Sequence, residues 1–358
     1  MENKRTCLYD RHVKQGALIS PFGGFDMPIQ YSNITEEHQA VRQQCGVFDV
    51  SHMGEVTVKG PDAERWVNHI FTNDVTDAPI GKVFYGMMLY ENGGTVDDLL
   101  VYKMAEQEYF IVINAANIDK DWAWMQQNAE GFDIDLQNRS DDYGQLAVQG
   151  PDAAEIMEKV LRLNCDDLTF YTVKTIDDII VSRTGYTGED GFEIYGTQAY
   201  IQQAWDALMG AGVTPCGLGC RDTLRFEVGL PLYGHELSPE ISPVMAGLSM
   251  FCKLDKPEFI GKEAIVKQKT EGVAQKVVGI ELDDKAIPRN GYTVLKDGRE
   301  VGIVTTGYHT ISTDKSVCMA LVDTEYAKLD TPLDIQIRKK VFPGHVVKKR
   351  FYDKHYKK

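Results

Sequence analysis

The segment that most constrains the fold is residues 82–104, KVFYGMMLYENGGTVDDLLVYKM. Two runs rich in Val, Tyr, Phe, Met and Leu flank Asn92, Gly93 and Gly94, which accept the positive φ angles of tight turns. The pattern predicts an antiparallel β-hairpin, and the apolar run Tyr109–Asn117 predicts a third strand of the same meander. The chain therefore pairs sequential strands here, which a regular β-α-β alternation does not do.

Two adjacent aspartates, Asp97 and Asp98, lie in the middle of the second predicted strand. Because side chains alternate between the faces of a strand, only one of the two can face the core. A loop at Asn92-Gly93 places Met87 opposite Asp98, whereas a loop at Gly93-Gly94 places Leu89 there. The sequence leaves both registers open.

The face of Asp98 also carries apolar and aromatic side chains: Tyr85, Met87, Leu100 and Tyr102. A carboxylate in such surroundings needs a polar partner, since burying it unpaired costs several kcal/mol or keeps it protonated. The alternative is that this face is solvated and Asp98 is an ordinary surface acid. Buried acids mark functional sites only in some proteins, so both interpretations stay open on this evidence.

Composition narrows the function classes. The 358 residues suffice for two or three domains, and the net charge of −15 argues against sequence-independent binding of nucleic acid. No apolar run is long enough to cross a membrane and the first residues lack a secretory signal, so we expect a cytoplasmic protein that does not bind membranes. Seven scattered cysteines without a CxxC motif favour a reducing compartment, and we expect no metal site.

Positive charge gathers at one end of this acidic chain. Residues 338–358 contain nine Lys and Arg residues and one acid, Asp353. One interpretation is a solvated strand with a frayed end; the other is a docking surface for an acidic partner.

An internal repeat indicates a duplication. The segments VTVKGPDAERWVNHI (56–70) and LAVQGPDAAEIMEKV (146–160) share a strand, a Gly-Pro-Asp-Ala turn and an amphipathic helix. Asp62 and Asp152 fall near the helix starts, where we expect their carboxylates to accept from free backbone N–H groups. Mixed helices and antiparallel hairpins predict the α+β class.

The pattern changes after about residue 265. Polar residues 267–275 are the linker candidate, and short strands separated by turns at Asn290-Gly291 and Asp297-Gly298 follow. This part predicts a small all-β domain of sandwich or barrel type. We therefore expect a first region at 1–265 and a C-terminal β domain at 276–358.

Two further segments place charge in unusual positions. In SRTGYTGEDGFEIY (182–195), Glu193 lies between Phe192 and Ile194 of an apolar strand. In GLGCRDTLRFE (217–227), Arg221 falls in the first turns of a predicted helix, where it opposes the helix dipole. Arg221 therefore needs an anion or a side-chain partner, and a structural salt bridge to Asp222 or Glu227 is the simpler alternative.

Several long motifs, in order along almost the whole chain, resemble the aminomethyltransferase of the glycine cleavage system, the T-protein. They are FDVSHMGE, NGGTVDDL, NAAN, SRTGYTGEDGFE, GLGCRDTLRFE and FIGKEA. The resemblance implies three domains around a central hole that holds folate: two interleaved α+β subdomains, roughly 1–50 plus 140–265 and 51–139, and the C-terminal barrel-like domain. It also implies transfer of a methylene group from the aminomethylated lipoyl arm of the H-protein to tetrahydrofolate, with release of ammonia.

The resemblance also implies roles for individual residues. Asp98 matches the essential aspartate beside the folate nitrogens, and Glu193 matches the acid that binds the pterin ring. The remaining matches are wall or substrate-site residues: Tyr85, Tyr102, Asn114, Arg221 and Tyr356. Independently of the resemblance, a carboxylate such as Glu193 suits the donor edge of a pterin, and a tuned acid such as Asp98 can hold a proton or help position the reactants.

Three departures from the family pattern are visible: Phe25 and Met250 at positions where relatives usually carry Trp, and the segment His309–Ser316.

Two other functions share this scaffold. One is a folate-dependent demethylase of a small methylated substrate. The other is a non-catalytic iron-sulfur assembly factor, whose usual motif contains a cysteine where this chain has Arg183-Thr184-Gly185-Tyr186.

Overall fold

The predicted meander is present, in the first of the two registers. The computed structural model describes residues 2–357, in which β5 (Val83–Leu89) and β6 (Thr95–Ala105) pair antiparallel with Met87 opposite Asp98. Strand β7 (Glu108–Ile113) follows. The predicted continuation of this strand to Asn117 is wrong, because the backbone N–H of Asn114 donates to Asp97 Oδ2 at 3.0 Å and the chain turns into the 3₁₀ helix η1 (Ala115–Asn117).

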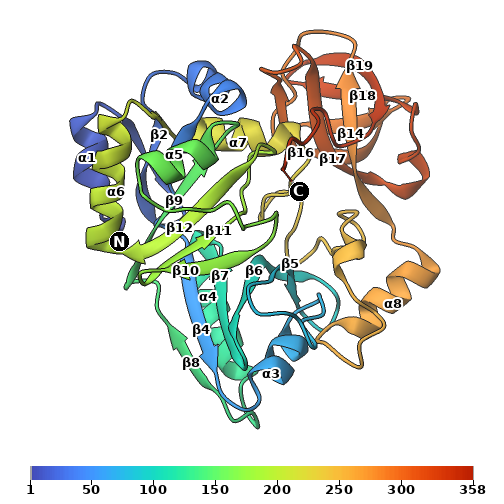
Figure 1. Ribbon diagram of the computed structural model, residues 1–358. Helices are drawn as coiled ribbons and strands as arrows, with labels where there is room; N and C mark the ends of the chain where they lie inside the picture. Colours follow the sequence, from blue (N-terminus) through green and yellow to red (C-terminus); the bar gives the residue numbers. More distant parts are fainter. Residues whose placement is uncertain (1, 358) are drawn as a thin grey trace.

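The meander belongs to a five-stranded antiparallel sheet, ordered β5-β6-β7-β4-β8, with β4 (Gly54–Lys59) and β8 (Asp135–Asn138) completing it. Helices α3 (Ala63–Ile70) and α4 (Ile118–Gln127) cover one face. Their apolar residues, among them Trp66 and Met125, pack on Val56, Val58 and Ile111 of the sheet. The sheet therefore has one face covered by its own helices and one face free for another layer (Figure 1).

A six-stranded sheet lies beside it, ordered β10-β11-β12-β9-β3-β13. Its strands are β3 (Gly46–Asp49), β9 (Tyr143–Gln149), β10 (Val173–Ile176), β11 (Ile179–Ser182), β12 (Gly191–Thr197) and β13 (Thr214–Cys216). Only β13 pairs parallel, with β3. Helices α5 (Ala153–Lys159) and α6 (Gln198–Gly210) pack on one face, while α2 (Ile34–Gln43) and α7 (Leu218–Glu227) pack around Phe48 and Ala147.

The two sheets meet through one apolar cluster, in which Tyr102 and Phe110 of the first sheet contact Ile180 and Tyr195 of the second. Strand alternation then places Asp98 on the same face as Tyr102, and Glu193 on the same face as Tyr195. Both acids therefore point towards the junction of the sheets.

The internal repeat corresponds to β4–α3 and β9–α5. Gly60 and Gly150 have nearly equal φ angles of 131° and 133°, and a Cβ would lie 2.6 Å from the carbonyl oxygen of Asp133 or 2.3 Å from that of Gln44. These turns therefore need glycine. Asp62 and Asp152 are the N-cap residues, but neither side chain caps its helix, so that expectation is wrong. The Asp62 carboxylate instead accepts from the backbone N–H of Asp133 at 2.9 Å.

The C-terminal part is a closed six-stranded barrel, which decides between the sandwich and the barrel. Strand β14 pairs with both β17 and β19 and so closes the ring β14-β17-β16-β15-β18-β19. The strands are β14 (Gln275–Leu282), β15 (Thr293–Lys296), β16 (Arg299–His309), β17 (Ser316–Asp323), β18 (Pro332–Ile337) and β19 (Lys340–Val347). Much of the expected linker is helical instead, because α8 covers Lys262–Glu271.

The remaining elements are short: α1 (Tyr9–Lys14), the two-stranded β1 (Leu18–Phe22) and β2 (Phe25–Gln30), η2 (Ser249–Phe251) and η3 (Thr324–Tyr326). The predicted α+β class with a barrel-like C-terminal domain is confirmed. Among residues 2–357, no helix is long and apolar enough to span a bilayer. We propose that the domain boundaries follow the two sheets and the barrel, as the sequence led us to expect.

Candidate active site

Asp98 is held by hydrogen bonds from two elements. Tyr85 Oη on β5 donates to Asp98 Oδ2 at 2.9 Å, and Asn114 Nδ2, just after β7, donates to Oδ1 at 3.1 Å. Burial, and then the charge of Asp97, raise the pKa of Asp98 to about 7 in spite of these two hydrogen bonds. Asp98 is therefore no ordinary surface acid, and near neutral pH it exists in both protonation states.

Asp97 points to the opposite side of β6 and is completely buried. Its carboxylate accepts from the backbone N–H of Asn114 at 3.0 Å, from Asn114 Nδ2 at 2.9 Å and from Asn117 Nδ2 at 2.7 Å. Asp97 thus fixes the amide that donates to Asp98. Sequence reasoning placed the two aspartates on opposite faces correctly, but it missed that Asn114 joins them.

Glu193 is almost fully buried on β12. Its carboxylate accepts from Thr184 Oγ1 at 2.5 Å and from Gln145 Nε2 at 3.4 Å. Burial raises the pKa of Glu193, while the Thr184 hydrogen bond and the charge of Arg221 oppose the rise. Each carboxylate oxygen has one protein donor, so each keeps acceptor capacity for a ligand.

The resemblance implies that Tyr102 lines the wall of the site, but in the structure it lies deeper. Its side chain is completely buried, and its hydroxyl lies 2.8 Å from that of Tyr195. Tyr195 Oη also accepts from Gln145 Nε2 at 3.1 Å, the same amide that donates to Glu193. Tyr102 therefore supports the Glu193 side of the site through Tyr195 and Gln145.

Arg221 has neither of the salt bridges that were the simpler alternative. Asp222 pairs with Arg225 at 2.7 Å, and Glu227 pairs with Arg42 at 3.1 Å. The guanidinium of Arg221 lies 4.8 Å from the ring centre of Tyr186, and its buried Nη1 has no hydrogen-bond partner within the described part of the chain. A buried donor without a partner is costly, which favours a ligand group at this position.

The sequence analysis did not single out three aromatic residues of the site: Tyr171, Tyr186 and Phe251. Tyr186 faces the guanidinium of Arg221, and Tyr171 packs against Phe170; burial raises the pKa of both phenols, with the charge of Asp98 among the lesser causes. Phe251 packs edge-on against Tyr85 with ring centres 4.9 Å apart. Tyr186 is flanked by the glycines of SRTGYTGED, so the motif contained a signal for it. Neighbouring Met250 is 70% exposed.

Tyr356 is held near the site by the end of the chain. Its ring stacks on Phe170 with centres 4.1 Å apart and planes 19° apart, and burial raises the pKa of its phenol to about 12. Phe170 in turn packs against Tyr171. The backbone N–H of His355 donates to the carbonyl of Gly188 at 2.7 Å, so this segment is docked and the interpretation as a frayed end is wrong.

Other surface features lie apart from this group. A cavity of about 470 Å³ is lined mainly by polar residues of the N-terminal segment and the β8–β9 turn, with Phe25 on its wall. Within residues 2–357, no group of His, Cys, Asp and Glu side chains has the arrangement of a metal site.

Comparison with known proteins identifies the family. The model of the GCVT N-terminal domain matches residues 8–256, and that of the glycine cleavage T-protein C-terminal barrel domain matches residues 275–353. The chain belongs to the glycine cleavage T-protein family. The aminomethyltransferase of Alkaliphilus oremlandii is 47% identical over the full length of both chains, and that of Lysinibacillus sphaericus is 47% identical over 98% of both.

A solved structure of the same family shares the fold. The glycine cleavage system aminomethyltransferase T from Bartonella henselae superposes with a TM-score of 0.96 at 31% identity, covering 99% of each chain. These matches confirm the resemblance read from the motifs and show that this T-protein is an aminomethyltransferase. They lend no support to the demethylase or to the iron-sulfur assembly factor.

Proposed function

We propose that this enzyme transfers the methylene group of the aminomethylated lipoyl arm of the H-protein to tetrahydrofolate. The products are 5,10-methylenetetrahydrofolate, ammonia and dihydrolipoyl H-protein. One observation carries the proposal: Asp98, with a pKa of about 7, is held between Tyr85 and Asn114 at the sheet junction to which Glu193 also points.

The polar groups around Asp98 suit a folate. Glu193 keeps acceptor capacity for the donor edge of a pterin, and the unpaired Nη1 of Arg221 suits an electron-rich group of the ligand. The rings of Tyr85 and Tyr356 offer flat apolar surface for its ring system, and Tyr102 supports the Glu193 side through Tyr195. This assigns all the residues that the family pattern singled out.

The balance of protons in the transfer reaction explains why an acid with a pKa near neutrality is useful at this site. Forming the methylene bridge breaks the C–S and C–N bonds of the aminomethyl group and replaces two folate N–H bonds with two C–N bonds. One of the released protons ends on the lipoyl sulfur and the other on ammonia. Because its pKa is about 7, Asp98 can accept and return a proton near neutral pH, which is the property required of a general acid-base group. Positioning of the reactants is the other role open to it.

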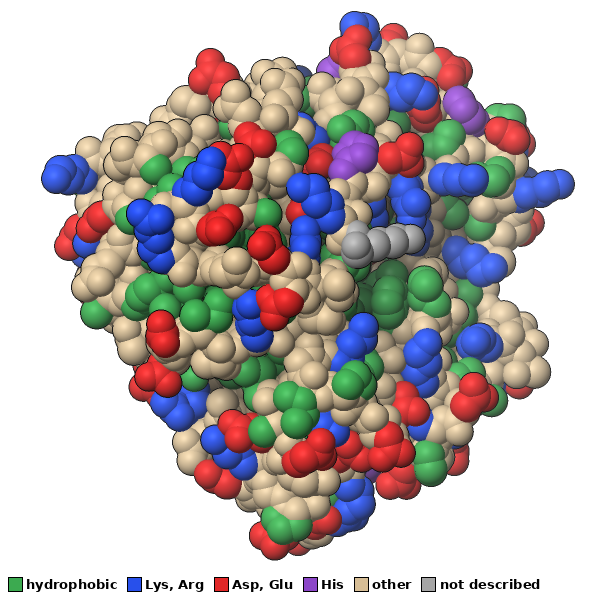
Figure 2. All heavy atoms as spheres, in the orientation of Figure 1, with side chains coloured by type: hydrophobic (Ala, Val, Ile, Leu, Met, Phe, Trp, Pro, Cys, Tyr) green, Lys and Arg blue, Asp and Glu red, His purple; other side chains and the backbone are tan. Residues whose placement is uncertain are grey.

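The H-protein is the proposed partner, and the exposed basic residues near the C-terminus are its proposed contact. Lys348 and Arg350 are exposed, whereas Lys349 donates to the carbonyl of Ala246 and burial lowers its pKa. Of the three neighbouring basic residues, only Lys348 and Arg350 are therefore proposed as docking groups. Figure 2 shows Lys and Arg side chains around the centre of the face on which the chain ends (Figure 1).

The proposal is tested by ammonia release from aminomethylated H-protein, measured with and without tetrahydrofolate. We expect rapid release that requires folate and yields 5,10-methylenetetrahydrofolate in equal amount. Sarcosine and dimethylglycine, offered in place of the H-protein, test the demethylase. Turnover of either small molecule in preference to the H-protein, or no transfer at all, would contradict the proposal.

A further inference from the structure

The last residues of the chain form a strap. We use this name for residues 348–356, which leave the barrel and return to the centre of the molecule, where Figure 1 marks the chain end. The backbone N–H groups of Phe351 and Tyr352 donate to the carbonyl of Glu227 at 2.8 and 2.7 Å. His355 then donates to the carbonyl of Gly188, and Tyr356 stacks on Phe170. The strap thus links α7 to the site.

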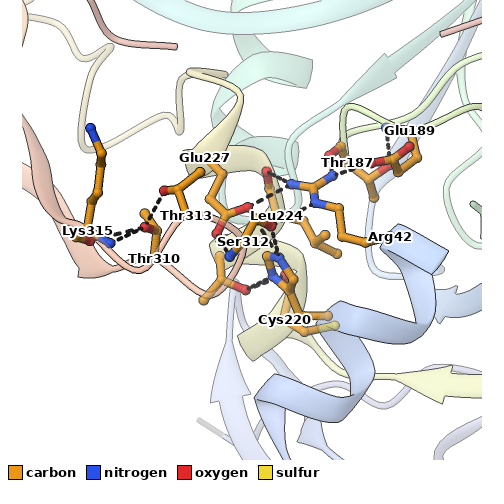
Figure 3. Close-up of polar contacts among 12 residues, drawn as sticks. Arg42, Thr187, Glu189, Cys220, Leu224, Glu227, Thr310, Ser312, Thr313 and Lys315 are labelled. Carbon is orange, nitrogen blue, oxygen red and sulfur yellow. Dashed lines mark hydrogen bonds and ion pairs between the residues drawn. The ribbon is translucent and has the colours of Figure 1, made fainter. Parts of the chain in front are cut away.

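Arg42, on α2, lies under the strap and is almost completely buried, with 6% of its side chain exposed. Its Nη1 donates to the Thr187 carbonyl at 2.6 Å and to Glu189 Oε1 at 3.0 Å, and its Nη2 pairs with Glu227 Oε2 at 3.1 Å (Figure 3). The guanidinium lies 4.3 Å from the ring centre of Tyr352. One side chain therefore contacts the strap and both segments to which the strap is hydrogen-bonded.

The carboxylates of this cluster also hold the strap and the barrel. Glu189 lies 3.2 Å from His355 Nδ1. Glu227 Oε1 accepts from the backbone N–H of Ser312, in the barrel loop that departs from the family pattern. Burial would raise the pKa of Glu227, but the hydrogen bond and charge of His38 lower it to about 2. Glu227 is thus ionised at neutral pH, and the guanidinium of Arg42 pairs with it at 3.1 Å.

We propose that Arg42 is a positioning residue of the transferase site, which acts by holding the strap so that Tyr356 closes the folate pocket. The inference rests on the proposed function, because Tyr356 has a role only if folate binds beside it. Arg42 itself contacts Thr187, Glu189, Glu227 and the strap, so its effect on folate passes through Tyr352 and Tyr356.

Tyr352 offers the cleanest test because its ring, and no charge, provides the contact to Arg42. Tyr352→Leu removes the stack, and Tyr352→Phe keeps it. Tyr9→Leu is the matched control, since it removes a similar stack of Arg5 on Tyr9, at 4.2 Å, on α1. Arg42→Lys keeps the charge for the two carboxylates but loses the planar group. If Arg42→Lys does not fold, the Tyr352 pair still decides.

Two readouts are compared in the full-length enzyme: hydrogen exchange of the peptide covering 348–357, and the dissociation constant for tetrahydrofolate by calorimetry. Tyr352→Leu and folded Arg42→Lys should exchange faster in this peptide and bind folate roughly two- to thirtyfold more weakly, the range for a lost cation–π contact. Tyr352→Phe and Tyr9→Leu should match the wild type in both.

Faster exchange with unchanged folate affinity would overturn the inference, as would unchanged exchange in Tyr352→Leu. Both readouts are independent of turnover. A wild type that binds folate but releases no ammonia from aminomethylated H-protein would refute the proposed function while leaving the exchange and affinity results to judge the strap.

Discussion

The substitution Asp98→Asn should make the stability of the enzyme less sensitive to pH. Asn keeps the shape and an acceptor oxygen for Tyr85, but it carries no charge at any pH. In the wild type, burial and the neighbouring Asp97 raise the pKa of Asp98 from 3.8 to about 7. The native state therefore binds this proton more tightly than the unfolded state does.

The sign and size of the effect follow from linkage. A raised pKa stabilises the native state at low pH, and this contribution is lost as the pH rises through about 7. A rise of three pKa units corresponds to about 4 kcal/mol at most, because one unit is worth about 1.4 kcal/mol. Relative to the wild type, Asp98→Asn should therefore gain up to that amount between pH 4.5 and pH 8, whatever its offset at low pH.

The assay is urea unfolding of both proteins at a series of pH values, followed by fluorescence, with the difference in unfolding free energy plotted against pH. Other titrating groups cancel in this difference when they are unaffected by the substitution. Asp206→Asn is the control: Arg11 lowers the pKa of this exposed acid through a hydrogen bond, so its difference curve should be flat over the same range. A flat or falling curve for Asp98→Asn would refute the raised pKa.

Two further predictions concern ligands. Glu193→Gln should weaken tetrahydrofolate binding by about 1–3 kcal/mol, the range for losing a charged hydrogen-bond partner in a buried site. Calorimetry that finds native affinity in a folded Glu193→Gln enzyme would exclude this role. Replacing Lys348 and Arg350 with Ser should raise the KM for H-protein and reduce its dependence on salt, since exposed charges attract over a Debye length. Steady-state kinetics at low and moderate salt test this, and an unchanged KM at both would contradict it.

The local part of the site was predictable from the sequence. The turn residues Asn92–Gly94 and the alternation of β6 fixed which aspartate faces Tyr85, within two possible registers. Choosing between the registers needed the structure, because a bulge between Met88 and Leu89 shifts the pairing. The barrel was likewise predicted as one of two all-β forms, which only the pairing of β14 with β19 decides.

The partners of individual side chains were less predictable. Asp222 is a neighbour of Arg221 in sequence, yet it pairs with Arg225, one helical turn along, since residues three apart share a helix face. Stacking of Tyr352 on Arg42 joins residues far apart in the chain, and no local pattern announces it. The role of Asn114 was expected only from the family, whereas its link to both aspartates became visible in the folded chain.

The most direct test of the account is the single-turnover rate of ammonia release from aminomethylated H-protein, at saturating tetrahydrofolate, for Asp98→Asn and Asp97→Asn. We predict that Asp98→Asn is slower by at least about a hundredfold, with folate affinity largely kept, because only Asp98 is placed for acid-base chemistry. Asp97→Asn should keep most of the rate and lose stability instead. Normal release by Asp98→Asn, or loss of activity confined to Asp97→Asn, would contradict the assignment.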